Sequence, residues 1–190
     1  MSRHLTLAEL EAGLPEILNA PKDNGTLAAI VIRPQSGQWV ELGSCEVSLK
    51  LGTHGDNWPN GCWKTTDNGS PHPDVQICIM NARCIALIAQ DRDNWAPAGD
   101  NLFIDMDLTP GNVPPGTQLA IGTAVIEITD TPHNGWAPRH CATGRRAHCK
   151  ARAGDKRLNG LTVWNTWPDW SLPTRSLAHF FCASSLNSWP

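Results

Sequence analysis

The sequence predicts an α+β fold that is predominantly β, with a barrel-like sheet and a short N-terminal amphipathic helix. Three observations predict it. Leucine and isoleucine recur at helical spacing near the N-terminus, and short apolar segments separated by turn residues follow. A hairpin that pivots at Gly122 then has the sharp glycine turn typical of small β-barrels. The 190 residues suffice for one domain with its own core.

The helix is the first element that we expect. Thr6 and Glu9 have the T-x-x-E spacing of a capping box, in which each side chain accepts a hydrogen bond from the backbone N–H group of the other residue. Pro21 cannot continue a helix, so it ends the pattern. The apolar stripe that would pack on the sheet consists of Leu7, Leu10, Leu14, Ile17 and Leu18.

Extended segments make up most of the pattern that follows. We expect strands at residues 27–33, 40–51, 75–80, 102–108, 118–121 and 124–129. Asn81 is expected to cap a helix that runs to Gln90.

Glycine and proline predict a loop over residues 51–64, in which Asp56 and His54 lie beside Trp58 and Trp63. Such a loop is a common place for a ligand. The simpler interpretation is a turn in which the Asp56 carboxylate accepts hydrogen bonds from nearby backbone N–H groups.

Charge divides the chain into two parts. Residues 1–138 hold 7 Lys and Arg against 16 Asp and Glu, whereas residues 139–190 hold 8 against 2. We therefore expect one acidic domain over residues 1–138 and an atypical basic, Trp-rich tail over residues 139–190.

Two absences bear on the location of the protein. No apolar run is long enough to cross a bilayer, and the N-terminus lacks the apolar region of a secretory signal. The 7 cysteines are odd in number and irregularly spaced, which indicates reduced thiols rather than a disulfide framework. We expect a cytoplasmic protein with no membrane partner.

Five segments together resemble a known family, the MOSC domains, named after the C-terminal part of molybdenum cofactor sulfurases and found also as stand-alone bacterial proteins. They run in the family's order and cover most of residues 1–136. The segments are GTHGDNW at 52–58, PDVQICIMNAR at 73–83, AGDNLFIDMDL at 98–108, PPGTQLAIGTAVIEIT at 114–129 and PHNG at 132–135.

The resemblance implies a barrel-like MOSC fold and a protein that handles sulfur or molybdenum cofactor. The implied roles are sulfur carrying or transfer and binding of molybdenum, with pyridoxal phosphate as a further ligand associated with such proteins. A sulfur-transferase-like or molybdenum-cofactor-dependent activity is implied by this resemblance alone. The implied partners are a cysteine desulfurase or a molybdoenzyme, and we do not expect nucleic acid.

The same resemblance points to site residues and exposes a departure from the family's pattern. The family has a Cys just after the Pro-His-x-Gly segment, and this chain has Trp136 there. Indole has one N–H donor and no metal-binding lone pair, so it cannot replace a thiolate. His133 is retained, and Cys141 is the one nearby thiol that could substitute, so these two are the candidate catalytic residues. The chain is therefore expected to be a degenerate member if Cys141 does not substitute.

The matched motifs also contain the candidate cofactor-binding residues, which are Asp56, Asp100 and Asn101. No set of metal ligands is predicted.

Three interpretations of the basic tail stay open. The pairs His140-Cys141 and His148-Cys149 resemble zinc ligands, but the usual spacing between zinc ligands is absent. A basic strip could contact nucleic acid, although such runs are more often solvated. This strip consists of Arg139, Arg145, Arg146, Lys150, Arg152, Lys156 and Arg157.

The third interpretation, which we favour, is that the reading frame shifts near codon 136, which would leave the body without its final strands and with an open sheet edge. Translation of the other two frames of the coding DNA tests it. The alternative function class is a non-catalytic binding protein whose basic tail contacts nucleic acid or an acidic partner.

Overall fold

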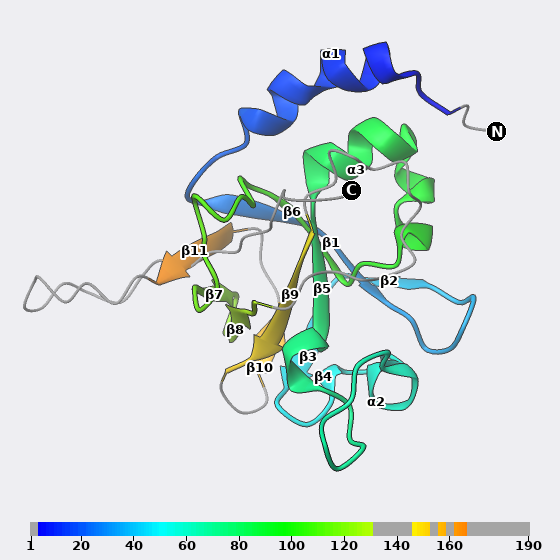
Figure 1. Cartoon of the computed structure of the whole chain (residues 1–190), viewed down its shortest axis with the longest axis vertical. Coiled ribbons are helices and arrows are strands. Elements are labelled where there is room, and N and C mark those ends of the chain that lie inside the picture. Colours follow the sequence, from blue (N-terminus) through cyan, green and yellow to red (C-terminus); the bar gives the residue numbers. More distant parts are fainter. Residues whose placement is uncertain (1–3, 131–145, 153–155, 159–161, 167–190) are drawn as a thin grey trace, which may run out of the picture.

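The computed structural model of the chain describes residues 4–130, 146–152, 156–158 and 162–166 (Figure 1). The helices are α1 (Leu7–Leu18), α2 (Trp58–Gly61) and α3 (Ala82–Ala89). The strands are β1 (Gly25–Ile32), β2 (Val40–Leu42), β3 (Cys45–Ser48), β4 (Gly52–Thr53), β5 (Ile77–Asn81), β6 (Leu102–Asp105), β7 (Gln118–Ile121), β8 (Ala124–Ile128), β9 (Arg146–Ala151), β10 (Lys156–Leu158) and β11 (Thr162–Thr166). Three short 3₁₀ turns, at Pro73–Val75, Arg92–Asn94 and Ala96–Ala98, complete the described elements.

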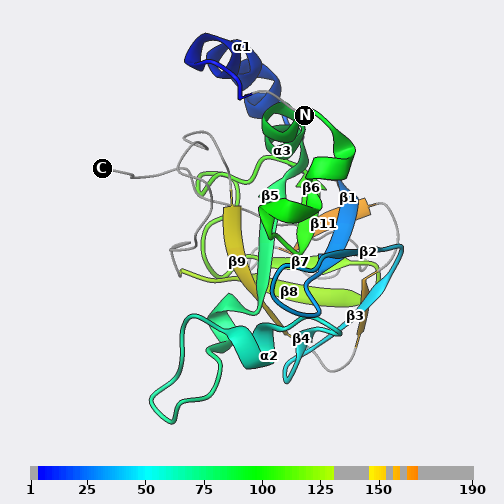
Figure 2. The same cartoon turned by 90° about the vertical axis from the view of Figure 1, so that its right-hand side faces the viewer.

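The main sheet curls until its ends meet. Its strands pair in the order β11-β7-β8-β9-β5-β6-β1-β2, and β1 also pairs with β11. All these pairs are antiparallel except β5 with β6. Figure 2 shows β7 and β8 running across the direction of β5. The result is a barrel-like sheet, to which β3, β4 and β10 add a small three-stranded sheet. The predicted α+β, predominantly β class is confirmed.

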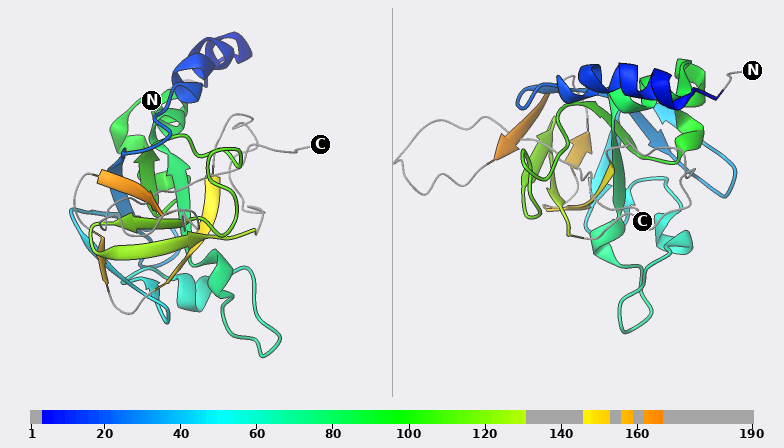
Figure 3. Two further views of the ribbon diagram at one scale, coloured as in Figure 1. Left: turned by 90° about the vertical axis from the view of Figure 1, so that its left-hand side faces the viewer. Right: turned by 45° about the horizontal axis from the view of Figure 1, so that its top comes forward.

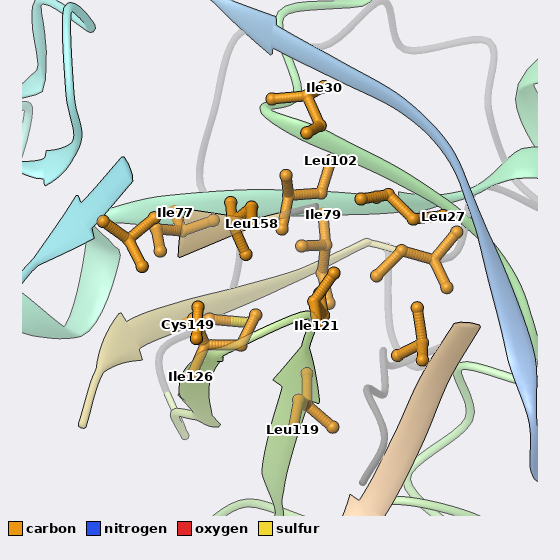
Figure 4. Packing of buried hydrophobic residues seen from close by; sticks show 14 of the residues in the cluster. Leu27, Ile30, Ile77, Ile79, Leu102, Leu119, Ile121, Ile126, Cys149 and Leu158 are labelled. Atoms are coloured by element: carbon orange, nitrogen blue, oxygen red, sulfur yellow. The ribbon is translucent and has the colours of Figure 1, made fainter. Parts of the chain in front are cut away.

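The interior of the barrel is a single apolar cluster built by alternate residues of its strands. Side chains from strands far apart in the sequence meet there, among them Ile79, Leu102, Ile126 and Cys149 (Figure 4). A second cluster lies on the other face of β5 and β6, where Phe103 packs on Trp95 with ring centroids 5.5 Å apart. The central strands are therefore buried on both faces, which explains their nearly continuous apolar sequences.

The helices α1 and α3 begin where their N-caps predict. The Thr6 side chain accepts the N–H of Glu9 and the Glu9 carboxylate accepts that of Thr6, so the expected capping box is present. Asn81 caps α3 through the N–H of Cys84. Figure 3 shows α1 lying outside the barrel against α3. Gly13 permits this approach, because a Cβ there would lie 2.6 Å from the Leu87 side chain. The expected packing of α1 on the sheet is therefore wrong, since α3 lies between them.

Strands from the predicted tail complete the main sheet. β9 lies between β5 and β8, with Ile77 opposite Cys149 and Glu127 opposite Lys150. The expectation of an open edge after the last hairpin is therefore wrong for the described residues. The sequence signal for β9 was weak because buried and outward-facing residues alternate over only a few positions. Cys149 and Ala151 are buried, and Lys150 is turned outward. A boundary at residue 138 and a frame shift near codon 136 stay predictions.

None of the helices in the described part of the chain is long and apolar enough to cross a membrane.

The first prediction concerns this completion of the sheet. Fragment 1–138 removes β9, β10 and β11, so it exposes the edges of β5 and β8 and apolar surface of the barrel. We expect this fragment to aggregate or to unfold without a cooperative transition when it is heated. Fragment 1–166 keeps every described strand and is expected to unfold cooperatively. A soluble fragment 1–138 with the same unfolding midpoint as fragment 1–166 would contradict the prediction.

Candidate functional site

Two of the matched motifs meet at one guanidinium group. Arg33 follows β1 directly, Asp56 lies in the loop after β4, and Asn101 precedes β6. The Arg33 Nε and Nη2 atoms donate to the two oxygens of Asp56, each over 3.0 Å. Arg33 Nη2 also donates to Asn101 Oδ1 over 3.1 Å, and Asn101 Nδ2 donates to Asp56 Oδ2 over 3.0 Å. We call Arg33, Asp56 and Asn101 the arginine clamp.

Glycine turns bring the clamp together. Gly55 has φ +87° and Gly99 has φ +86°, values that favour glycine over residues with a side chain. Each glycine directly precedes one of the acidic motif residues, Asp56 and Asp100. The Gly99 carbonyl accepts a 2.8 Å hydrogen bond from Arg33 Nη1, so the turn itself is bound to the clamp.

Asp56 is saturated with hydrogen bonds and its side chain is 1% exposed. In addition to the side-chain donors, its oxygens accept the backbone N–H of Arg33 over 2.8 Å and that of Trp58 over 2.9 Å. A carboxylate has about four lone-pair positions, which these donors fill. Asp56 therefore has no acceptor position left for a metal or cofactor, and it works as the turn cap that the simpler interpretation predicts.

The amide of Asn101 is also fully engaged. Its Oδ1 accepts the backbone N–H of Cys78 over 3.0 Å as well as the bond from Arg33, and its Nδ2 donates to Val31 O over 3.2 Å. Asn101 is completely buried, as is Asp100. These residues join β1, β5 and β6 at one end of the barrel.

The electrostatics of the clamp oppose the binding of an anion. Burial acts to lower the pKa of Arg33, but the hydrogen bonds and charge of Asp56, together with nearby Cys78 and Asp100, raise it above its ordinary value. Arg33 is thus permanently charged, yet two carboxylates surround it. Asp56 already balances the Arg33 charge through two hydrogen bonds, so the clamp is a poor site for a phosphate or an oxyanion.

The other predicted residues divide as follows. His133, Cys141 and Trp136 lie outside the described residues, so their placement stays a prediction. Arg33 was missed by sequence reasoning, although an Arg that ends an apolar strand just before Pro34 is a usable signal. Cys149 lies in the barrel core, so it is not available as one of the zinc ligands that the His-Cys pairs resemble. Within the described ranges no group of three or more His, Cys, Asp or Glu side chains could hold a metal ion.

The basic residues of the tail that the structure describes contact acidic residues of the body. Lys150 Nζ lies 3.1 Å from Asp74 and 3.3 Å from Glu127, and Arg152 Nε lies 3.0 Å from Glu127. The hydrogen bond and charge of Asp74, with those of Glu127, raise the pKa of Lys150 despite partial burial. These contacts pair the charges of Lys150 and Arg152 with carboxylates of the body.

A polar row lies on the small sheet, across β10, β3 and the residue that follows β4. Arg157 Nη2 donates to Glu46 over 2.8 Å, and the second oxygen of Glu46 lies 3.8 Å from His54 Nδ1. His54 Nε2 lies 2.9 Å from the Ser48 hydroxyl. Behind the row, burial raises the pKa of the Cys45 thiol, whose Sγ lies 3.2 Å from Glu46 O. Cys45 is therefore a neutral thiol rather than a nucleophile at neutral pH.

Comparisons with known proteins bear on the fold. No family model matches the chain, and no curated protein matches it. A solved structure described as a crystal structure of a hypothetical protein is similar with a TM-score of 0.50 and 15% identity, over 81% of this chain and 78% of that one. At this identity the likeness shows the fold alone.

The second prediction tests the clamp. Asp56→Asn removes the charge that pairs with Arg33 and places an NH₂ group beside existing donors. We expect a loss of about 2–3 kcal/mol in the free energy of unfolding, measured by denaturant titration. Asp67→Asn changes an exposed loop carboxylate and is expected to stay within about 0.5 kcal/mol of the unchanged chain. Equal losses in the two variants would show that the clamp does not stabilise the fold.

The third prediction concerns the thiols. Cys45 is 6% exposed with a raised pKa, whereas Cys62 is half-buried in the loop after α2. Iodoacetamide at neutral pH should therefore label Cys62 well before Cys45, as measured by mass spectrometry of the peptides. Denaturant should remove the difference. Faster labelling of Cys45 in the folded protein would contradict the assigned burial and pKa.

Proposed function

We propose that this chain handles sulfur as a MOSC-type carrier, with Cys141 as the thiol and His133 as the neighbouring base. The observation that carries the proposal is the meeting of two family-like motifs, GTHGDNW and AGDNL, through the 3.0 Å hydrogen bond between Asp56 and Asn101. The barrel-like sheet agrees with the fold that the resemblance implies.

The arginine clamp supports the site in this proposal rather than binding a ligand itself. The polar atoms of the clamp make hydrogen bonds within the protein. Asp56 and Asn101 would therefore hold β1, β5 and β6 together at one end of the barrel. Asp100 would act in the same way through its charge on Arg33. In this proposal, Asp56, Asp100 and Asn101 position the site and do not bind the cofactor themselves.

The described residues do not fit a molybdenum centre, because they include no group of ligands for a metal and the clamp has no open acceptor. Pyridoxal phosphate bound as a Schiff base needs a lysine that loses its proton readily. Lys150 is held charged by two carboxylates, so it is a poor candidate for that lysine. Sulfur carrying needs only one accessible thiolate.

The chemical step is a transfer of sulfane sulfur from a persulfide donor, such as a cysteine desulfurase. The Cys141 thiolate attacks the outer sulfur of the donor's persulfide, a new S–S bond forms, and the donor leaves as a thiolate. His133 would take the thiol proton beforehand. The five described cysteines are free thiols, which supports a reducing, cytoplasmic setting for this chemistry.

The fourth prediction tests this step. The full chain incubated with a cysteine desulfurase and cysteine should gain a persulfide, detected as a mass increase of one sulfur after trapping. Cys141→Ala should abolish the gain, and Cys62→Ala, which removes a half-buried thiol elsewhere, should leave it unchanged. A persulfide that is unchanged in Cys141→Ala would remove Cys141 from the proposal. Metal analysis of the same samples tests the molybdenum alternative.

The second candidate function is non-catalytic binding through the basic tail. The ion pairs of Lys150, Arg152 and Arg157 with body carboxylates favour an intramolecular role for these charges over a nucleic-acid role. Nucleic-acid affinity that falls steeply with salt would support the binding function instead.

A further inference from the structure

A shallow hollow lies beside the polar row of the small sheet. Its volume is about 240 Å³, and it is formed where the end of β2, the following turn, β3, the residue after β4 and β10 come together. The lining residues are Leu42, Ser44, Cys45, Glu46, His54 and Arg157. None of them belongs to the arginine clamp or to the proposed sulfur carrier, so the hollow is a separate feature of the fold.

One wall of the hollow carries a fixed pair of opposite charges. Arg157 Nη2 and Glu46 Oε1 are 2.8 Å apart, and their side chains are 55% and 46% exposed. The hydrogen bond and charge of Arg157 lower the pKa of Glu46, so both groups are charged at neutral pH. Among the described residues the Arg157 guanidinium makes this single hydrogen bond, and a guanidinium has five N–H donors. Most of its donors are therefore not engaged by the described residues.

We propose that this hollow binds a small α-amino acid in its zwitterionic form. The ammonium group would lie against Glu46 and the carboxylate against Arg157, so that the two dipoles run antiparallel. The side chain of the amino acid would then face Leu42 and Cys45, which supply an apolar and weakly polarisable surface.

The charge balance of the wall selects a zwitterion over a simple ion. An anion would meet the Glu46 carboxylate next to its guanidinium partner, and a cation would meet Arg157, so each gains one attraction and suffers one repulsion. An α-amino acid has its own opposite charges on neighbouring atoms and satisfies both. Exposed Arg–Glu pairs contribute little to stability, so the pair can open slightly for the ligand at little cost.

His54 and Ser44 lie at the edge of the same hollow and add hydrogen-bonding groups. His54 is oriented by Ser48 on one ring nitrogen and by Glu46 near the other. The Cys45 thiol stays neutral, since burial raises its pKa, and it offers contact rather than reaction. The inference therefore concerns binding of an amino acid and includes no chemical step.

The experiment is a titration of the isotope-labelled full chain with L-alanine, followed by two-dimensional NMR of the backbone amides. We expect saturable shifts at Ser44, Cys45 and Glu46. N-acetyl-L-alanine, which lacks the ammonium, and L-alanine methyl ester, which lacks the carboxylate, should each bind at least about tenfold more weakly.

Two variants and a matched control assign the site. Arg157→Gln and Glu46→Gln should each weaken L-alanine binding by about tenfold or more. Arg92→Gln removes another exposed Arg–Glu pair, in which Arg92 Nη2 lies 2.6 Å from Glu41, and should leave binding unchanged because Arg92 does not line the hollow.

Several results would overturn the inference. They are the absence of saturable shifts up to the solubility of L-alanine, equal binding of either blocked analogue, or binding that survives both hollow variants. A loss of binding in Arg92→Gln equal to that in Arg157→Gln would also overturn it, since it would indicate a general effect of charge.

Discussion

The ion pair between Arg33 and Asp56 is the interaction on which this end of the barrel depends. Asp56 is almost fully buried, and its carboxylate is joined to β1, to the loop before α2 and, through Asn101, to β5 and β6. A buried charge without its partner is strongly unfavourable, so the three segments can pack only in the arrangement that satisfies it. The glycines at positions 55 and 99 provide the turns that this arrangement needs.

Charge also links the two parts of the chain. The acidic body and the basic tail differ greatly in net charge, and the structure explains part of this difference by direct pairing across strands. Lys150 lies opposite Glu127 in the β8–β9 pair, and Arg157 lies opposite Glu46 in the β10–β3 pair. Such partly exposed pairs add little stability one by one, but they favour this strand register over others.

The sequence predicted the fold class, both capped helices and the hairpin at Gly122, because each of these depends on local patterns of a few residues. It did not predict how β9–β11 complete the sheet, since their inward positions are few and interrupted by Lys150 and Arg152. Asp56 and Asn101, both expected from the motifs to be site residues, hydrogen-bond to each other in the structure, and their role in a site stays a prediction. Their saturation by Arg33 could not be predicted, because it depends on the pairing of β1 with β6, a contact between distant segments. The register of that pair cannot be predicted from the sequence of either strand alone.

Arg33 and Asp56 stabilise the fold as a coupled pair rather than as two separate residues. A double-mutant cycle with Arg33→Gln and Asp56→Asn, followed by denaturant titration, measures the coupling free energy directly. We predict a favourable coupling of about 2 kcal/mol, in the upper part of the range for residues in one hydrogen-bond network. Additive effects, with a coupling below about 0.5 kcal/mol, would contradict it.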